Sequence, residues 1–256
     1  MVVETMKLLR LPREEWQEEQ TVPVEKRLYM SLLGSLCYAA ITCRPDIAFS
    51  VSFLSQWGTD PRQLHLDALT RVLRYLVCTR EASLVYQGLG ATVQPCVYTD
   101  SDWGSEAKGL SRAGWTAKVA GGAISWYSKK LHLVATSSAE AEYKALAEGT
   151  KEALWLKNVM GELGFQLQPI KLYCDNQSAI NMSKNPVQHH KSRHFQLSWH
   201  LVRQVQEAGD TQVRFVNSGM QDADILTKAL TVRVHCQAAG RLGLDLSKTK
   251  IKTQDS

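Results

Sequence analysis

Apolar and polar positions change their spacing near residue 90 of the 256-residue chain. From residue 24 to 79, apolar residues recur every three or four positions, which is the spacing of one buried face of a helix. Pro45 and Asp46 are residues that can begin the second of three such stripes. The stripes consist of Tyr29, Leu32, Leu33 and Leu36; of Ile47, Val51 and Leu54; and of Leu66, Leu69, Val72, Leu73 and Leu76. Residues 26–90 are therefore predicted to be mainly helical, after a polar lead-in over residues 1–25.

Beyond a linker candidate at residues 88–90, β-branched and aromatic residues gather in short runs typical of strands. Gly121 and Gly122 separate two of these runs, which is a strong hairpin signal. The predicted strands are 83–87, 96–99, 114–120, 123–127, 170–174 and 212–216, and the predicted helices are 138–163, 176–182, 190–208 and 221–229. From residue 91 to 230 this order predicts one α/β domain with a mixed five-stranded sheet flanked by helices. Residues 231–256 are expected to form a loosely held basic tail.

Composition narrows the classes of protein. No apolar run is long enough to cross a membrane, and the first residues lack the order of a secretory signal. The six cysteines are scattered without a C-x-x-C pair, which favours reduced thiols over a disulfide framework and predicts a cytoplasmic or nuclear protein without a membrane partner. A net charge of +5 is a mild indication of a polyanionic partner.

Four acidic residues fall where a predicted strand ends or a helix begins. Asp100 follows the strand at 96–99, and open α/β sheets place their chemistry at the ends of such strands. Glu142, Asp175 and Asp224 occupy comparable positions later in the chain. Four carboxylates from four elements would form a site for hard divalent cations. Two such ions, about 4 Å apart, can activate a water and stabilise the leaving oxygen when a phosphodiester is cleaved.

The long helix contains two candidate glutamates. Glu140 has capping-box spacing from Ser137 and stands four residues before Lys144, so it is expected to serve the helix itself. Glu142 begins an apolar stripe that must face the sheet, where a carboxylate is costly unless a metal, a basic group or a core-edge hydrogen bond satisfies it. The stripe continues with Leu146, Gly149, Ala153, Leu156 and Met160.

Asp175 and Asp224 have a structural alternative. Each stands at the start of a predicted helix, where an aspartate commonly caps the first turn. Asp222 could take the capping role instead of Asp224. The repeated placement of acidic residues at one sheet edge is what favours the metal site.

Several longer motifs resemble a known family. They are Tyr98-Thr-Asp-Ser-Asp-Trp103, Gly122-Ala-Ile-Ser-Trp-Tyr-Ser-Lys-Lys130, Ser137-Ser-Ala-Glu-Ala-Glu-Tyr-Lys-Ala-Leu146, Glu152-Ala-Leu-Trp-Leu156, Tyr173-Cys-Asp-Asn-Gln-Ser-Ala-Ile180 and Ala223-Asp-Ile-Leu-Thr-Lys-Ala-Leu230, with Leu33-Gly-Ser-Leu-Cys-Tyr38, Thr42-Cys-Arg-Pro-Asp-Ile-Ala-Phe49 and Arg71-Val-Leu-Arg-Tyr-Leu76 upstream. From about residue 25 to 231, the chain resembles the ribonuclease H domain of a copia-type LTR-retrotransposon polyprotein, preceded by the C-terminal tail of its reverse transcriptase.

This resemblance implies a ribonuclease H-like fold over residues 91–230 and a reverse-transcriptase remnant over residues 26–90. It further implies an endonuclease that uses two Mg²⁺ or Mn²⁺ ions to cut the RNA strand of RNA–DNA hybrids, with the polymerase part as a further partner and virus-like particles as the setting of a live element. The metal ligands it implies are Asp100, Glu142, Asp175 and Asp224. Many cellular ribonucleases H carry a mobile histidine before the last aspartate, whereas residues 216–220 contain none, so slow turnover is expected.

Basic and amide side chains near these motifs are candidates for nucleic-acid contacts. They are Lys129, Lys130, Asn176, Gln177, Lys184, Lys191 and Arg193. His190 and His194 have a spacing that could hold zinc, but together with His189 and His200 they are better explained as part of a surface that faces phosphates. Trp103, Trp115 and Trp126 could stack on bases or belong to the core.

Two other interpretations remain open at this stage. One is a nucleic-acid-binding remnant of a truncated retroelement that no longer catalyses. The other is a product without a role, or one that needs the absent polymerase for its stability.

Overall fold

The computed structural model describes residues 22–88, 93–132, 134–184 and 193–249. Their contacts form two compact units, which are described separately. The first unit combines the described residues up to Val85 with those from Lys228 onward. The second unit runs from Tyr86 to Thr227.

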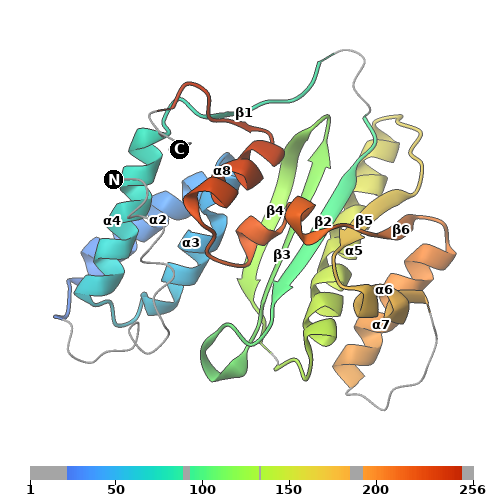
Figure 1. The fold of residues 1–256 in the computed structure, drawn as a ribbon, viewed down its shortest axis with the longest axis horizontal. Helices are drawn as coiled ribbons and strands as arrows, with labels where there is room; N and C mark the ends of the chain where they lie inside the picture. Colours follow the sequence, from blue (N-terminus) through green and yellow to red (C-terminus); the bar gives the residue numbers. More distant parts are fainter. Residues whose placement is uncertain (1–21, 89–92, 133, 185–192, 250–256) are drawn as a thin grey trace. The chain divides into compact units, whose positions relative to one another are not determined.

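The second unit is built on a five-stranded sheet (Figure 1). The strands are β2 (Cys96–Asp102), β3 (Arg112–Val119), β4 (Gly122–Lys130), β5 (Ile170–Cys174) and β6 (Thr211–Phe215), in the order β4-β3-β2-β5-β6. The pairs β2–β3 and β3–β4 are antiparallel, whereas β5 runs parallel to β2 and β6 runs parallel to β5. The mixed sheet and ribonuclease H-like fold predicted from the sequence are therefore confirmed, and so is the hairpin, which turns at Gly121 with φ +82°.

Helix α5 (Ser138–Glu162) packs on β2 and β3 and runs along one face of the sheet (Figure 1). Its predicted apolar stripe is buried, and Gly149 lies where the helix comes closest to β2. A Cβ atom on Gly149 would stand 2.4 Å from Cγ2 of Thr99 and 3.2 Å from Cγ1 of Val97. The glycine therefore permits the close approach of helix and strand that brings Glu142 beside the end of β2.

The remaining helices of this unit are α6 (Gln177–Lys184) and α7 (Arg193–Glu207). The helix predicted at residues 221–229 is wrong, because that region contains only the 3₁₀ turn η6 (Asp224–Leu226). Another 3₁₀ turn, η5 (Ser218–Met220), precedes it. Tertiary contacts explain the difference. The Gln221 amide donates to the Thr99 carbonyl oxygen at 2.9 Å, and the Asp222 carboxylate pairs with Lys118 at 2.7 Å, so this segment is held against the sheet.

The first unit is mainly helical, as predicted. Its elements are α2 (Lys26–Thr42), η2 (Pro45–Ile47), α3 (Ala48–Leu54), η3 (Ser55–Trp57) and α4 (Gln63–Cys78), followed by the two-residue strand β1 (Ser83–Leu84). One residue from each predicted stripe, Tyr29, Leu54 and Leu69, is completely buried in their common core. In the described part of the chain, no helix combines the length and apolar character needed to cross a membrane.

Residues 232–245 contain a helix and a strand, contrary to the expectation of a loose basic tail over residues 231–256. Helix α8 (Val232–Arg241) packs against η2, and strand β7 (Leu244–Asp245) pairs antiparallel with β1. The buried positions of α8 and the turn after it are His235, Ala238, Ala239 and Leu242. This is helical spacing, but histidine and two alanines do not read as an apolar stripe.

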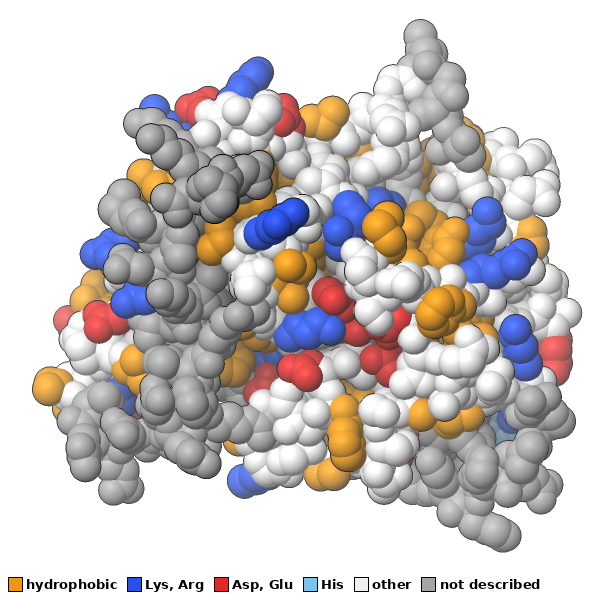
Figure 2. Space-filling model, in the orientation of Figure 1, with side chains coloured by type: hydrophobic (Ala, Val, Ile, Leu, Met, Phe, Trp, Pro, Cys, Tyr) orange, Lys and Arg blue, Asp and Glu red, His pale blue; other side chains and the backbone are white. Residues whose placement is uncertain are grey.

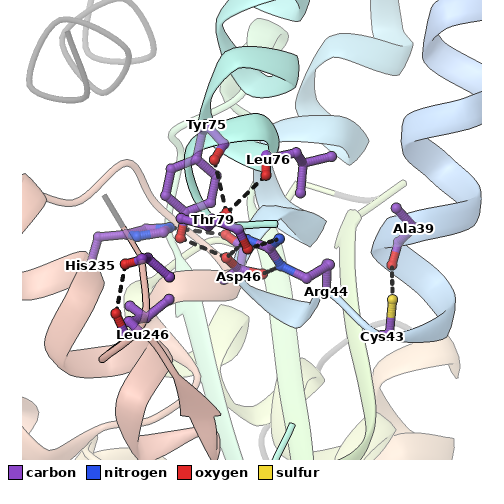
Figure 3. A network of polar contacts seen from close by, with 10 residues as sticks. Ala39, Cys43, Arg44, Asp46, Tyr75, Leu76, Thr79, His235 and Leu246 are labelled. Atoms are coloured by element: carbon purple, nitrogen blue, oxygen red, sulfur yellow. Dashed lines mark hydrogen bonds and ion pairs between the residues drawn. The ribbon is translucent and has the colours of Figure 1, made fainter. Parts of the chain in front are cut away.

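A buried polar network joins η2, α4 and α8 (Figure 3). Asp46 is its centre: the carboxylate accepts hydrogen bonds from Arg44 at 2.7 and 2.9 Å and from the Tyr75 hydroxyl at 2.6 Å. Arg44 also donates to the Thr79 side chain at 2.7 Å. The Asp46 carbonyl oxygen lies 3.0 Å from Nε2 of His235, so that nitrogen must carry the proton.

Because of this burial, the unit is expected to lose stability as the pH falls below 6.5. Burial lowers the pKa of His235, although Asp46 partly offsets this effect. A depressed folded-state pKa means that the unfolded chain takes up the proton first, so the contribution is complete above pH 6.5 and is lost as the pH falls toward the folded-state pKa. Urea unfolding at pH 7 and pH 5 should show a loss that approaches about 1.4 kcal/mol per pH unit. His235→Gln should remove this part of the pH dependence; an equal slope in the variant would contradict the assignment.

Candidate metal centre

Three aspartates from three elements converge at one end of the sheet. Asp100 lies in β2, Asp175 directly follows β5, and Asp224 begins η6. Tyr98 pairs with Tyr173 across the parallel strands, so Asp100 and Asp175 each follow two residues later at the same level. One carboxylate oxygen from each aspartate lies within 4.8 Å of the other two. Figure 2 shows acidic side chains gathered in the middle of this face.

Glu142 stands beside this group, in the second turn of α5. Its Oε1 accepts hydrogen bonds from the backbone N–H and from the hydroxyl of Ser101, both at 3.0 Å. Burial raises the pKa of Glu142, and the charges of Asp100 and Asp175 raise it further. Glu142 is not one of the three residues whose oxygens lie within 4.8 Å of one another, so its role as a ligand stays a prediction.

The competing glutamate serves the helix, as expected. Glu140 accepts hydrogen bonds from the backbone and hydroxyl of Thr136 at 2.8 and 2.5 Å, and its own N–H donates to the Ser137 hydroxyl at 3.2 Å. Lys144 lies 3.5 Å from the same carboxylate. These contacts account for Glu140 and leave Glu142 as the glutamate of the centre.

Hydroxyl and thiol groups hold the carboxylates in position. The Thr227 hydroxyl donates to Oδ2 of Asp100, and the Ser218 hydroxyl donates to Oδ2 of Asp175 at 2.8 Å. The Cys174 thiol lies 3.8 Å from Oε2 of Glu142. Burial raises the pKa of Cys174, so the thiol stays protonated and can donate. The sequence reasoning missed these partners, and only Ser101, directly after Asp100, had a position that could have indicated its role.

The donor set suits a hard divalent cation. Carboxylate oxygens are the ligands that Mg²⁺ and Mn²⁺ prefer, and like charges this close together are costly without a cation between them. Asp222, which could have capped a helix in place of Asp224, is instead paired with Lys118. The residues present therefore fit the predicted Mg²⁺ or Mn²⁺, with Asp100, Asp175 and Asp224 as the residues placed to hold it.

The predicted nucleic-acid contacts have varied positions. Lys130 aligns with Arg112 and thus with Asp102 across three strands, which places Lys129 and Lys130 at the same end of the sheet as Asp100. Asn176 caps α6, since its Oδ1 accepts from the N–H of Ala179 at 3.0 Å. Gln177 and Lys184, at the two ends of α6, are exposed. Lys191 and the side chain of Arg193 lie outside the described residues.

The predicted histidine surface can be assessed only in part, because His189, His190 and the side chain of His194 lie outside the described residues. His200 is exposed. Of the three tryptophans, Trp115 is buried and stacks on Tyr127, and Trp126 is partly buried. Trp103 is 52% exposed, with its indole N–H donating to the Ala135 carbonyl oxygen at 2.9 Å.

Comparison with known sequences gave several relatives, although no protein-family model matches the chain. The chain is 37% identical over 203 residues to the retrovirus-related Pol polyprotein from transposon TNT 1-94 of Nicotiana tabacum, covering 79% of this chain and 15% of that protein. It is 37% identical over 218 residues to the Pol polyprotein from transposon RE1 of Arabidopsis thaliana, covering 84% and 15%. It is also 43% identical over 129 residues to secreted RxLR effector protein 161 of Plasmopara viticola, covering 50% and 90%. The chain thus spans about 15% of the length of these Pol polyproteins.

The chain also resembles several solved structures, with which it shares little sequence identity. RNase H1 from Halobacterium salinarum matches with 19% identity and a TM-score of 0.38, covering 52% of this chain and 94% of that one. The foamy viral protease-reverse transcriptase in complex with dsDNA matches with 15% identity and a TM-score of 0.39, covering 84% and 41%. The fold assignment rests on the order and directions of the strands described above.

Proposed function

The chain belongs to the copia-type family of retrovirus-related Pol polyproteins, and from this premise we propose that it hydrolyses the RNA strand of RNA–DNA hybrids. In this proposal, residues 91–230 are the ribonuclease H part of a reverse transcriptase, or derive from one. Residues 26–90 are the C-terminal remnant of the polymerase. The rest of that polymerase is the protein partner that we expect for this chain.

One observation carries the proposal: Asp100, Asp175 and Asp224 bring carboxylate oxygens within 4.8 Å of one another at the end of the sheet. A purely structural role does not explain this placement, because aspartates that only cap helices have no reason to converge. The hydrogen bonds from Ser218 and Thr227 fix two of the carboxylates before any ligand arrives, which favours a site that is already organised for binding.

The aspartates would hold two divalent ions, and Glu142 would complete their ligand set. When bound, such ions activate the attacking water and stabilise the leaving oxygen of the scissile phosphodiester. The surrounding protein residues hold the Glu142 carboxylate in place: Ser101 donates hydrogen bonds to one oxygen, and the Cys174 thiol faces the other. The raised pKa of Glu142, caused by burial and by Asp100 and Asp175, is consistent with a group of carboxylates that favours neutralisation.

Substrate binding is assigned to groups around this centre. We propose that Lys129 and Lys130 contact backbone phosphates, since they lie at the same end of the sheet. Asn176 and Gln177 follow Asp175 directly and offer amide donors and acceptors for the sugar edge, where the 2′-hydroxyl distinguishes RNA from DNA. Lys184, Lys191 and Arg193 would add further phosphate contacts.

The purified chain is expected to cleave a hybrid with a 5′-labelled RNA strand in the presence of Mg²⁺ or Mn²⁺, and to leave the labelled DNA strand intact. Chelation by EDTA should stop cleavage, and adding back excess Mg²⁺ should restore it, because in this proposal the bound ions activate the attacking water and stabilise the leaving oxygen. Gel separation of the two labelled strands measures both results. A double-stranded DNA of the same sequence is the control for strand specificity.

A folded protein that binds the hybrid but cleaves neither strand with either metal would overturn this proposal. The chain would then be a non-catalytic nucleic-acid-binding remnant, with the carboxylates retained as inherited structure. If the DNA strand were cleaved at a rate similar to that of the RNA strand, the chain would still be a nuclease, but the ribonuclease H assignment would be rejected.

A further inference from the structure

A groove of about 550 Å³ runs along the outer edge of β6, which is the last strand of the sheet. The strand itself, helix α6 and one side chain of α7 form its walls. Gln177 and Lys184 come from the two ends of α6, and Thr211, Arg214 and Phe215 come from β6. A volume of this size lies within the range of sites for small ligands, and it can hold one nucleotide.

The groove is positively charged. Its lining contains Lys184 and Arg214 and no aspartate or glutamate. Within the described residues, neither of these cations forms an ion pair. Two exposed cations in a concave lining without an acidic neighbour favour an anionic ligand, and a phosphate group meets this requirement.

Two further side chains point to a ligand that is more than a phosphate. Phe215 is 55% exposed in the groove lining, although phenylalanine is commonly buried. Thr211 is 4% exposed, and its hydroxyl finds no hydrogen-bond partner among the described residues. An aromatic ring, a hydroxyl and two cations together can stack on a base, meet a polar edge and bind a phosphate.

The groove opens next to the metal centre. Gln177 stands two residues after Asp175, and Phe215 stands three residues before Ser218, whose hydroxyl donates to Asp175. A strand that leaves the metal centre can therefore continue into this groove. A base that stacks on Phe215 must present a free face, as a base at a single-stranded end does.

We propose that this groove binds one unpaired nucleotide at a single-stranded end of the nucleic-acid substrate. Phe215 stacks on the base, Arg214 and Lys184 bind the phosphate, and the Thr211 hydroxyl contacts a polar edge of the nucleotide. The nature of the substrate rests on the proposed function, whereas the groove itself does not. If the groove binds an unpaired nucleotide, the chain should prefer hybrids with a single-stranded tail over blunt hybrids of the same paired length.

Fluorescence anisotropy in EDTA tests this preference without any contribution from cleavage. The probes are a blunt RNA–DNA hybrid and the same hybrid with a short single-stranded tail on the RNA strand or on the DNA strand. The full chain should bind one tailed hybrid about tenfold more tightly than the blunt one, as expected for one base stacked on an aromatic ring. Phe215→Leu should remove most of this tail preference, and Arg214→Gln should reduce it and flatten its dependence on salt.

Arg27→Gln is the matched control for charge, because Arg27 is an exposed arginine of α2 in the other unit. It should leave the ratio of tailed to blunt affinity unchanged. Equal binding of blunt and tailed hybrids by the unmodified chain would overturn the groove proposal, as would variants that weaken both probes equally. If no hybrid binds in EDTA and none is cleaved with Mg²⁺ or Mn²⁺, the proposed function fails as well; hybrid binding without tail preference rejects the groove alone. Circular dichroism and thermal melting confirm that each variant is folded.

Discussion

Asp175→Asn is expected to lower the rate of RNA-strand cleavage by more than about 100-fold, since losing even an outer partner of a metal ligand commonly costs 10- to 100-fold. Asparagine keeps the shape of the side chain, including an oxygen that can accept from Ser218, but it removes a charge from the group of three aspartates. The same reasoning applies to Asp100→Asn. Single-turnover cleavage at saturating Mg²⁺ measures the effect without interference from product release.

The lower cleavage rate of Asp175→Asn should come from a weaker metal site and not from unfolding of the protein. In metal-free protein, the three aspartates repel one another, so removing one charge should leave the melting temperature unchanged or raise it. Glu140→Gln is the matched control, because Glu140 lies on the same helix as Glu142 but is occupied by Thr136 and Lys144. It should retain cleavage within about tenfold of the unmodified chain, which is less than the loss of an outer ligand partner commonly causes. An active Asp175→Asn variant would exclude Asp175 as a ligand.

Local patterns in the sequence located the carboxylates because each was predicted to lie at the end of a strand or near the start of a helix. Strand runs and helical spacing are short-range signals, and parallel strands bring their ends to one edge, so the sequence alone could place Asp100 and Asp175 together. Their roles as metal ligands stay predictions. Helical spacing alone distinguished Glu142, which was predicted to face the sheet, from Glu140, which was predicted to serve the helix. The contacts agree: Glu142 accepts a hydrogen bond from Ser101 in β2, and Glu140 accepts one from Thr136 beside its own helix.

What the sequence did not indicate depends on contacts between distant residues. Ser218 and Thr227 meet the aspartates only because residues 217–227 lie against the sheet, and no local spacing encodes this arrangement. In the same segment, the contacts of Gln221 with Thr99 and of Asp222 with Lys118 override the helical pattern predicted there. Helix α8 was missed for a different reason: its buried face consists of alanines and His235, so its stability comes from packing and from a hydrogen bond to a residue 189 positions away.

The buried network around Asp46 carries the second large effect. Asp46→Asn is expected to lower the free energy of unfolding of the first unit by about 3–5 kcal/mol, the usual cost of leaving a buried charge without its partner. Asp46 is 2% exposed and Arg44 is 7% exposed, so water cannot replace the lost interaction. Burial alone would raise the pKa of Asp46, but the hydrogen bonds and charge of Arg44 outweigh it and hold that pKa below its usual value, which shows that the charged form is the one stabilised.

A double variant distinguishes pairing from simple burial. Arg44→Met combined with Asp46→Leu removes both charges, and it should be less destabilising than Asp46→Asn alone, because no buried charge is then left unpaired. Tyr75→Phe removes only the hydroxyl that donates to Asp46 and should cost about 1.5–3 kcal/mol, as for a hydrogen bond to a charged group. Amide hydrogen exchange in α4 reports on this unit separately from the sheet. If Asp46→Asn changes that protection by less than Tyr75→Phe does, the ion pair contributes little, and the packing of α8 must hold the C-terminal segment in place.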